Sequence, residues 1–155
     1  MTTTVGSLVF SLEQISESLL GEFMPLLSEH YLEIAHYKDI PLDPDWDRYR
    51  AIAAAGALRI FTARDSGKLI VYSIFFVQRN PHYKTSLSAI NDIIFIAKER
   101  RGFGRRFIAW CDEQLREIGV QVVVHHIKAA HDWSPMLERM GYDFQDKIMT
   151  RRLDH

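Results

Sequence analysis

The segment from Lys98 to Arg106, which reads KERRGFGRR, constrains the fold more than any other part of the chain. It follows an apolar run at residues 93–97 and precedes a helical pattern at residues 107–118. The first turn of a helix has four backbone N–H groups without partners, and the macrodipole places about half a positive charge there. Glycine lets the backbone approach a ligand closely, and arginine adds planar charged donors. The segment therefore predicts a strand that turns into a helix and binds a pyrophosphate at the helix start.

The size and composition suit one ordinary globular domain. The chain has 155 residues, of which 47% are hydrophobic and 25% are charged. Its formal net charge of −1 argues against a general nucleic-acid binder, so the basic segment 98–106 is a local feature, with nucleic-acid binding there as a minor alternative. The single cysteine, Cys111, excludes an internal disulfide and is more typical of a helix core residue than of a nucleophile. We find no secretion signal and no apolar run of about 18 residues, so we expect a cytoplasmic protein without a membrane segment.

Two helices are expected in the first third of the chain. Apolar residues recur at helical spacing over about 12–36, with Ser11 and Gln14 as a capping box and Pro25 as an interruption, which predicts one kinked helix or two pieces. Asp43 and Pro44 predict the start of a second helix, over about 45–54. The acids around Asp43 could instead attract a cationic substrate.

The rest of the chain alternates strand and helix patterns. A β-hairpin is predicted at 58–63 and 69–77, and its second strand is so continuously apolar that both its faces should be covered. The further elements are a strand at 86–97, a helix at 103–118, a strand at 121–127, a helix at 131–140 and a strand at 142–152. The order α-α-β-β-β-α-β-α-β is mixed α/β in a single domain, 1–155.

This order, with a glycine–arginine turn after the third strand, resembles the GNAT acetyltransferase superfamily. That family's turn reads Arg/Gln-x-x-Gly-x-Gly/Ala, and Arg101 and Gly104 match it, whereas Arg106 replaces the last small residue. The family's second motif, Asn-x-x-Ala-x-x-x-Tyr followed by Lys-x-Gly-Phe, is similar to the segment ending in Gly141-Tyr142, with Leu137 in the tyrosine position. Phrases around residues 125–132 also resemble a branch found in bacteriophages and prophages.

The resemblance implies a fold and different roles for two parts of the chain. The fold is an α+β-like one with a central, mostly antiparallel sheet, a splayed parallel pair of strands and helices on both faces. The helical part at about 12–56 would form the acceptor side, and the part at about 57–152 would bind the cofactor.

The resemblance also implies acetyl-CoA as co-substrate, held in the gap between two strands. The backbone of Phe95, Ile96 and Ala97 would pair with the pantetheine arm and polarise the thioester carbonyl. The pyrophosphate would be bound by the turn residues Arg101, Gly102, Phe103, Gly104, Arg105 and Arg106. His131 and Ser134, in the second motif, are further candidate cofactor contacts.

Two residues are the candidate catalytic groups. Asp92 lies on the strand that leads to the turn and is the candidate general base, although a structural acid is the alternative. Because Leu137 cannot donate a proton to the leaving thiolate, Tyr83 is the candidate acid, with His82 or His131 as substitutes and packing as its alternative role. His125 and His126 face opposite sides of a strand and have no nearby cysteine, so no metal site is expected.

These features together predict an acetyl-CoA-dependent N-acetyltransferase that acts on a small-molecule or peptide amine by direct attack on the thioester. A non-catalytic module that binds CoA or a host protein is the alternative. Leu137 favours that alternative, and the match at Arg101 and Gly104 opposes it. A homodimer is compatible with the sequence, but no residue argues for one.

Overall fold

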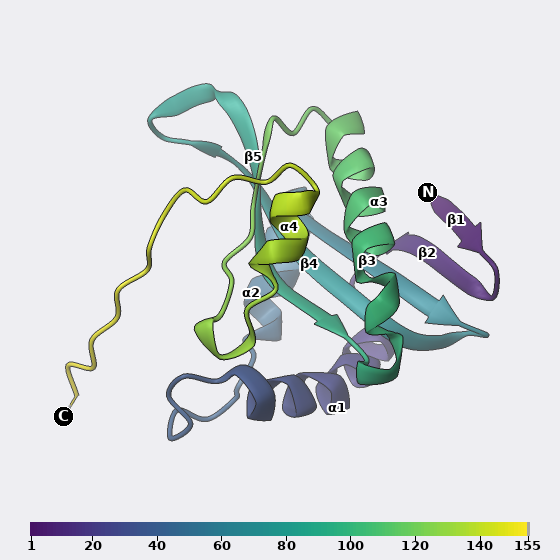
Figure 1. Ribbon diagram of the computed structural model, residues 1–155, viewed down its shortest axis with the longest axis horizontal. Helices are drawn as coiled ribbons and strands as arrows, with labels where there is room; N and C mark the ends of the chain where they lie inside the picture. Colours follow the sequence, from purple (N-terminus) through teal and green to yellow (C-terminus); the bar gives the residue numbers. More distant parts are fainter. Residues whose placement is uncertain (155) are drawn as a thin grey trace.

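The computed structural model describes residues 1–154, which form a six-stranded sheet flanked by helices (Figure 1). The strands are β1 (Thr2–Val5), β2 (Leu8–Glu13), β3 (Leu58–Asp65), β4 (Lys68–Asn80), β5 (Tyr83–Ile96) and β6 (Val122–Val124). The helices are α1 (Glu17–Ile34), α2 (Trp46–Ala54), α3 (Gly104–Glu117) and α4 (Ser134–Arg139), with short 3₁₀ turns η1 (Lys98–Phe103) and η2 (Ala129–His131). The strands lie in the order β1 to β6, and only β5 and β6 are parallel. The predicted mixed α/β class is confirmed.

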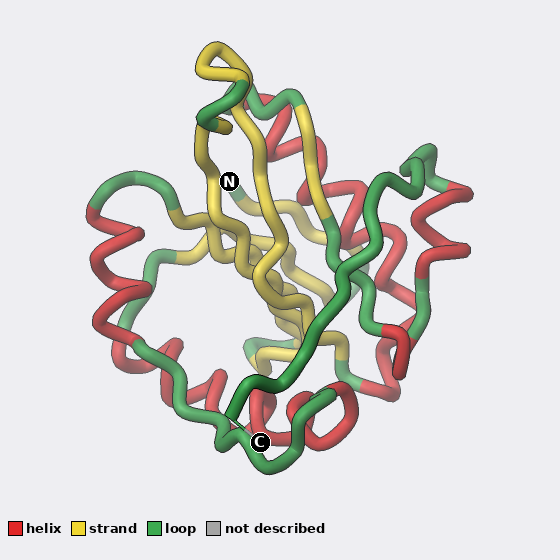
Figure 2. Tube along the Cα trace, turned by 90° about the vertical axis from the view of Figure 1, so that its left-hand side faces the viewer, coloured by secondary structure: helices red, strands yellow, loops and turns green. Residues whose placement is uncertain are grey.

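Helices lie on both sides of the sheet (Figure 2), and the sheet separates two hydrophobic cores. Alternate residues of β4 point to opposite faces, so Val71 and Phe75 join the core under α3, whereas Tyr72 and Ile74 join the core under α1. All four side chains are at most 2% exposed. This explains the continuous apolar run of β4, and the prediction that both its faces are covered is confirmed.

The first strands of the sheet were not predicted. Residues 2–5 and 8–13 form β1 and β2, so Ser11 lies in a strand and does not cap a helix. Ser16 caps α1, because its hydroxyl accepts the N–H of Leu19 at 3.1 Å, and α1 runs as one helix through Pro25. In the same way Asp45, not Asp43, caps α2 by accepting the N–H of Arg48 at 3.0 Å.

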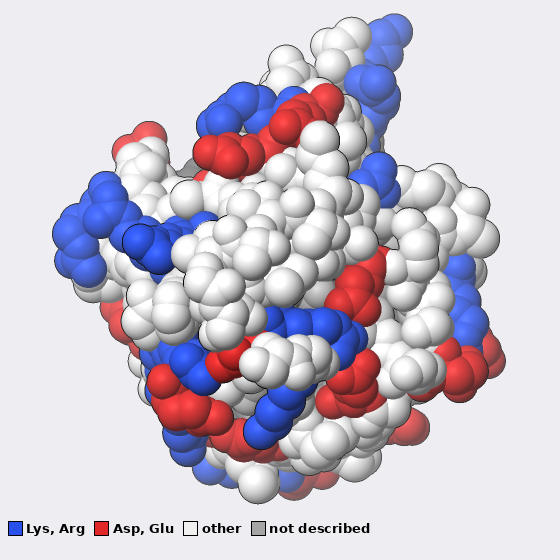
Figure 3. All heavy atoms as spheres, turned by 90° about the vertical axis from the view of Figure 1, so that its right-hand side faces the viewer, with Lys and Arg blue, Asp and Glu red and all other residues white. Residues whose placement is uncertain are grey.

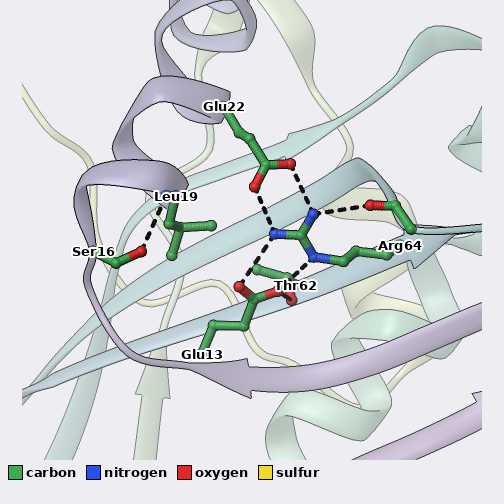
Figure 4. A network of polar contacts seen from close by, with 7 residues as sticks. Glu13, Ser16, Leu19, Glu22, Thr62 and Arg64 are labelled. Carbon is green, nitrogen blue, oxygen red and sulfur yellow. Dashed lines mark hydrogen bonds and ion pairs between the residues drawn. The ribbon is translucent and has the colours of Figure 1, made fainter.

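A polar network fixes α1 on the sheet (Figure 4). The Arg64 guanidinium on β3 donates to Glu13 on β2 at 2.8 Å and to Glu22 on α1 at 2.7 Å. The hydroxyl of Thr62 donates to the same Glu13 carboxylate at 2.6 Å. Because α1 also carries His30 and Glu33, this network sets the position of one wall of the site described below.

The predicted final strand at 142–152 is wrong. Within the described residues, no backbone hydrogen bond joins residues 143–154 to another segment, and Phe144 is 73% exposed. The α1–α2 connection holds this segment instead: the Thr150 hydroxyl lies 3.0 Å from that of Tyr37, and Arg152 pairs with Asp39 at 3.0 Å. Figure 2 shows the loop that leads to the C-terminus crossing in front of the sheet.

Candidate functional site

The parallel strands β5 and β6 separate and leave a cavity between them. They pair only at Ser88–Val122, Ala89–Val123 and Ile90–Val124, and β5 then continues alone on this edge to Ile96. A cavity of about 240 Å³ lies beside this free edge, with Trp133 and Met136 on its other wall. The predicted splayed pair is therefore present.

The free edge of β5 presents backbone donors to this cavity. The N–H of Ala97 donates to the Ile70 carbonyl on β4 at 2.9 Å, on the opposite edge. Because successive residues of a strand direct their N–H groups to alternate edges, the N–H groups of Ile96 and Ile94 face the cavity. Of the three residues predicted to pair with the pantetheine arm, only Ile96 has this orientation. Phe95 directs its backbone toward β4, and its side chain is buried.

A β-bulge sets the position of Asp92. Ile74 is paired with Ile93 and Phe75 with Asn91, so Asp92 is the extra residue on β5. The Asn91 amide stabilises this irregularity by donating to the Ser73 hydroxyl at 2.8 Å and to the Ile74 carbonyl at 3.2 Å. Released from the ladder, the Asp92 carboxylate accepts a hydrogen bond from the Tyr49 hydroxyl on α2.

A second, larger cavity of about 1370 Å³ adjoins the first. Its walls are the α1–α2 connection, the segment after β6 and residues 142–150. Asp92, Ile93 and His30 line both cavities, so Asp92 lies where the two meet.

The charge states of this junction follow from burial. Burial raises the pKa of Asp92, and the hydrogen bond from Tyr49 opposes that rise. Burial, and then the hydrogen bond to Asp92, raise the pKa of Tyr49 well above its ordinary value, so its hydroxyl stays protonated. Burial also lowers the pKa of His30, which is therefore neutral at pH 7. At the junction a protonated Tyr49 and a neutral His30 therefore lie beside Asp92, and Lys128 also lines both cavities.

The predicted phosphate turn forms η1 and the first turn of α3. A Cβ atom on Gly104 would lie 2.9 Å from Cδ1 of Ile96, so glycine permits the close packing of the helix start against β5. A Cβ on Gly102 would meet nothing within 4 Å. Arg105 and Arg106 are exposed, and neither has a side-chain hydrogen bond or ion pair with another described residue. Phe103 packs against the core under α3.

Arg101 is already paired. Its Nη2 atom donates to both Glu33 carboxylate oxygens at 2.7 and 2.9 Å, and His131 Nδ1 lies 3.6 Å from one of them. Arg101 and His131 line the smaller cavity, whereas Ser134 lines the larger one. The predicted cofactor contacts are therefore not all brought together, because five of them line neither cavity: Ala97, Gly102, Phe103, Arg105 and Arg106.

Tyr83 lies away from the site. It is 67% exposed beside the hairpin tip, lines neither cavity, and is nine residues before Asp92 on β5. At roughly 3.3 Å per residue this separation is about 30 Å, so the structure does not bring Tyr83 and Asp92 together. Neighbouring His82 is equally remote.

Tyr49 was missed as a site residue. Its place on the inner face of α2 is visible in the helical spacing of Trp46, Tyr49 and Ile52, but the sequence offers no sign that its hydroxyl meets Asp92.

His125 also lines the larger cavity. Burial lowers its pKa to about 4, and its ring packs edge-on against Phe75 and Trp133. Leu137 is 5% exposed and belongs to the core.

Three further properties of the described residues concern metal-binding clusters, membrane-spanning helices and surface charge. Within residues 1–154, no group of three or more His, Cys, Asp or Glu side chains is arranged to hold a metal ion. Among the described helices, none is long and apolar enough to cross a membrane. On the face shown in Figure 3, lysine and arginine alternate with aspartate and glutamate and form no continuous basic surface.

Comparison with known proteins identifies the fold. No family model and no curated protein matches the sequence. Among solved structures, the glucosamine-6-phosphate N-acetyltransferase of Arabidopsis thaliana matches with a TM-score of 0.68 at 16% identity, over 94% of this chain and 99% of the other. An aminoglycoside acetyltransferase from an uncultured soil metagenomic sample matches with a TM-score of 0.67 at 16% identity, over 94% and 97%.

A GNAT family acetyltransferase of Staphylococcus aureus matches with a TM-score of 0.68 at 16% identity, over 95% of this chain and 99% of the other. The chain thus has the fold of the GNAT acetyltransferases, and the predicted fold is confirmed. Likeness to a phage or prophage branch stays a prediction.

Proposed function

We propose that this protein is an acetyl-CoA-dependent N-acetyltransferase, with acetyl-CoA in the smaller cavity and an amine in the larger one. The observation on which the proposal rests is the position of Asp92, which lines both cavities. A carboxylate there is within reach of both reactants, as a general base must be.

The residues around the smaller cavity suit acetyl-CoA. The N–H groups of Ile94 and Ile96 can bind an extended amide-containing arm by strand-like hydrogen bonds. The start of α3, with Arg105 and Arg106 beside it, is suited to a pyrophosphate. Bound in this way, acetyl-CoA would supply a thioester whose carbonyl meets one of the two free N–H groups.

The proposed reaction is one direct transfer. Asp92 takes a proton from the bound amine as its nitrogen attacks the thioester carbon. The new C–N bond forms, the C–S bond breaks, and the thiolate departs and takes a proton from water. A backbone N–H of Ile94 or Ile96 stabilises the negative charge on the carbonyl oxygen. Holding the reactants together supplies effective molarities of about 10⁵–10⁸ M, so transfer does not need an acid at Leu137.

The acceptor proposed for the larger cavity is a small-molecule or peptide amine. Two of the structural neighbours are an aminoglycoside acetyltransferase and a glucosamine-6-phosphate N-acetyltransferase, which supports an amine in general. A volume of about 1370 Å³ is ample for either class.

The direct test is mass spectrometry of an amine library incubated with acetyl-CoA and the protein, with Asp92→Asn as the matched control. We expect one amine class to gain an acetyl group with wild type and to gain it far more slowly with the variant. Binding of CoA without any acetylated product would favour the non-catalytic alternative.

A further inference from the structure

We propose that Tyr49 is a positioning residue for Asp92, which holds one carboxylate oxygen so that the other faces the acceptor amine. This inference rests on the proposed function. The Tyr49 hydroxyl donates to Oδ2 of Asp92. Among the described residues, no hydrogen bond or ion pair reaches the other oxygen, Oδ1.

The Tyr49 ring is held firmly enough for this task. It lies on α2, whose first turn is capped by Asp45. The ring centroid is 5.4 Å from that of Trp46 and 5.9 Å from that of Phe76, on the sheet. Because packing on two sides restricts the ring, the hydroxyl has a fixed direction toward the bulge.

The bulge makes the contact necessary. As the unpaired residue of β5, Asp92 lacks the ladder partner that would orient it on the β4 side. The side-chain torsions of Asp92 leave its carboxylate free to change direction unless a partner holds it. A single donor on a rigid helix removes that freedom without occupying the second oxygen.

The same contact also favours the ionised form of Asp92. A tyrosine hydroxyl that donates stabilises a carboxylate more than a neutral carboxyl group. The other titratable or charged groups around this position are Tyr72 from β4, His30 from α1, and His126 and Lys128 after β6. The two histidines line the smaller cavity with Asp92, and the Tyr72 hydroxyl is buried without a hydrogen-bond partner. Tyr49 is therefore the one described side chain that donates a hydrogen bond to Asp92.

The alternative is that Tyr49 merely anchors α2 to the sheet. Tyr49→Phe distinguishes the two roles, because it keeps the ring contacts and removes only the hydroxyl. Tyr72→Phe is the matched control, since it removes a phenol hydroxyl from the adjacent core that makes no hydrogen bond.

The experiment is a carbon-13 NMR titration of the Asp92 carboxyl group in the protein without ligands, with Asp92→Asn to assign the signal. We expect Tyr49→Phe to raise the pKa of Asp92 by about one unit and Tyr72→Phe to leave it unchanged. In the acetylation assay, the acidic limb of the kcat/KM profile should move upward by the same amount with Tyr49→Phe.

An Asp92 signal that titrates alike in Tyr49→Phe and wild type overturns the inference. The titration needs no substrate, so its result is independent of the enzyme proposal, which an amine library without any acetylated product would overturn. The two experiments therefore distinguish a failure of the Tyr49 inference from a failure of the proposed function.

Discussion

One guanidinium nitrogen of Arg101 donates to both carboxylate oxygens of Glu33, and this pair joins the turn before α3 to the last turn of α1. The arginine that resembles the family's phosphate-turn residue is thus neutralised by the chain's own carboxylate. The Arg101 interaction holds the pKa of Glu33 below its ordinary value, so this carboxylate is ionised at neutral pH. A pyrophosphate at the turn would have to compete with Glu33 for Arg101.

We therefore expect Glu33→Gln to bind CoA more tightly than wild type, by about threefold, because a partly exposed ion pair contributes up to about 1 kcal/mol. Isothermal titration calorimetry with CoA measures this. Glu29→Gln, also on α1 but without an ion pair among the described residues, is the control. Equal affinity in all three proteins would show that Arg101 does not bind the cofactor.

The two glycines of the turn should respond differently to alanine. In Gly104→Ala the new methyl group pushes Ile96 toward the smaller cavity, so CoA should bind more weakly while the fold persists. Gly102→Ala places its methyl group in open space and should leave stability unchanged. Thermal shift with and without CoA checks both variants. If CoA raised the melting temperature of Gly104→Ala as much as that of wild type, the smaller cavity would not be the CoA-binding site.

Asp92→Asn should slow acetylation by about 10²–10⁴-fold, the usual contribution of a general base, with CoA affinity nearly intact. In wild type, burial raises the pKa of Asp92, so kcat/KM should fall as the pH drops through a value above that of an ordinary aspartate. Steady-state kinetics across pH checks both points. An unchanged rate in the variant would make Asp92 a structural acid.

The Arg64 network should contribute to stability. Arg64→Ala leaves Glu13 and Glu22 without their shared partner, and we expect a loss of roughly 1–3 kcal/mol in the free energy of unfolding. Arg50→Ala removes ion pairs with Glu17 and Asp47, whose side chains are 84% and 95% exposed, so its effect should be much smaller. Urea unfolding followed by circular dichroism compares them, and similar losses would contradict this ranking.

The sequence predicted the elements whose signals are local. The apolar run of β4, the turn at Arg101 and Gly104, and the helix after it all depend on neighbours in the chain. The features that were not predicted depend on residues far away in the sequence. β2 pairs with β3, which is more than 40 residues away in the sequence, and β1 pairs with β2. The position of Asp92 depends on a β-bulge opposite β4.

Residues 142–150 form one wall of the larger cavity, and among the described residues this segment pairs with no strand. The attachments of segment 143–154 to the α1–α2 connection are side-chain contacts, including Arg152 over the Tyr37 ring at 5.2 Å. Substitutions in this segment would change the shape of the larger cavity, and none of its residues belongs to either hydrophobic core. Under the proposed function, substitutions among residues 142–150 would change which amine fits the larger cavity and leave Asp92 and the β-bulge unaltered.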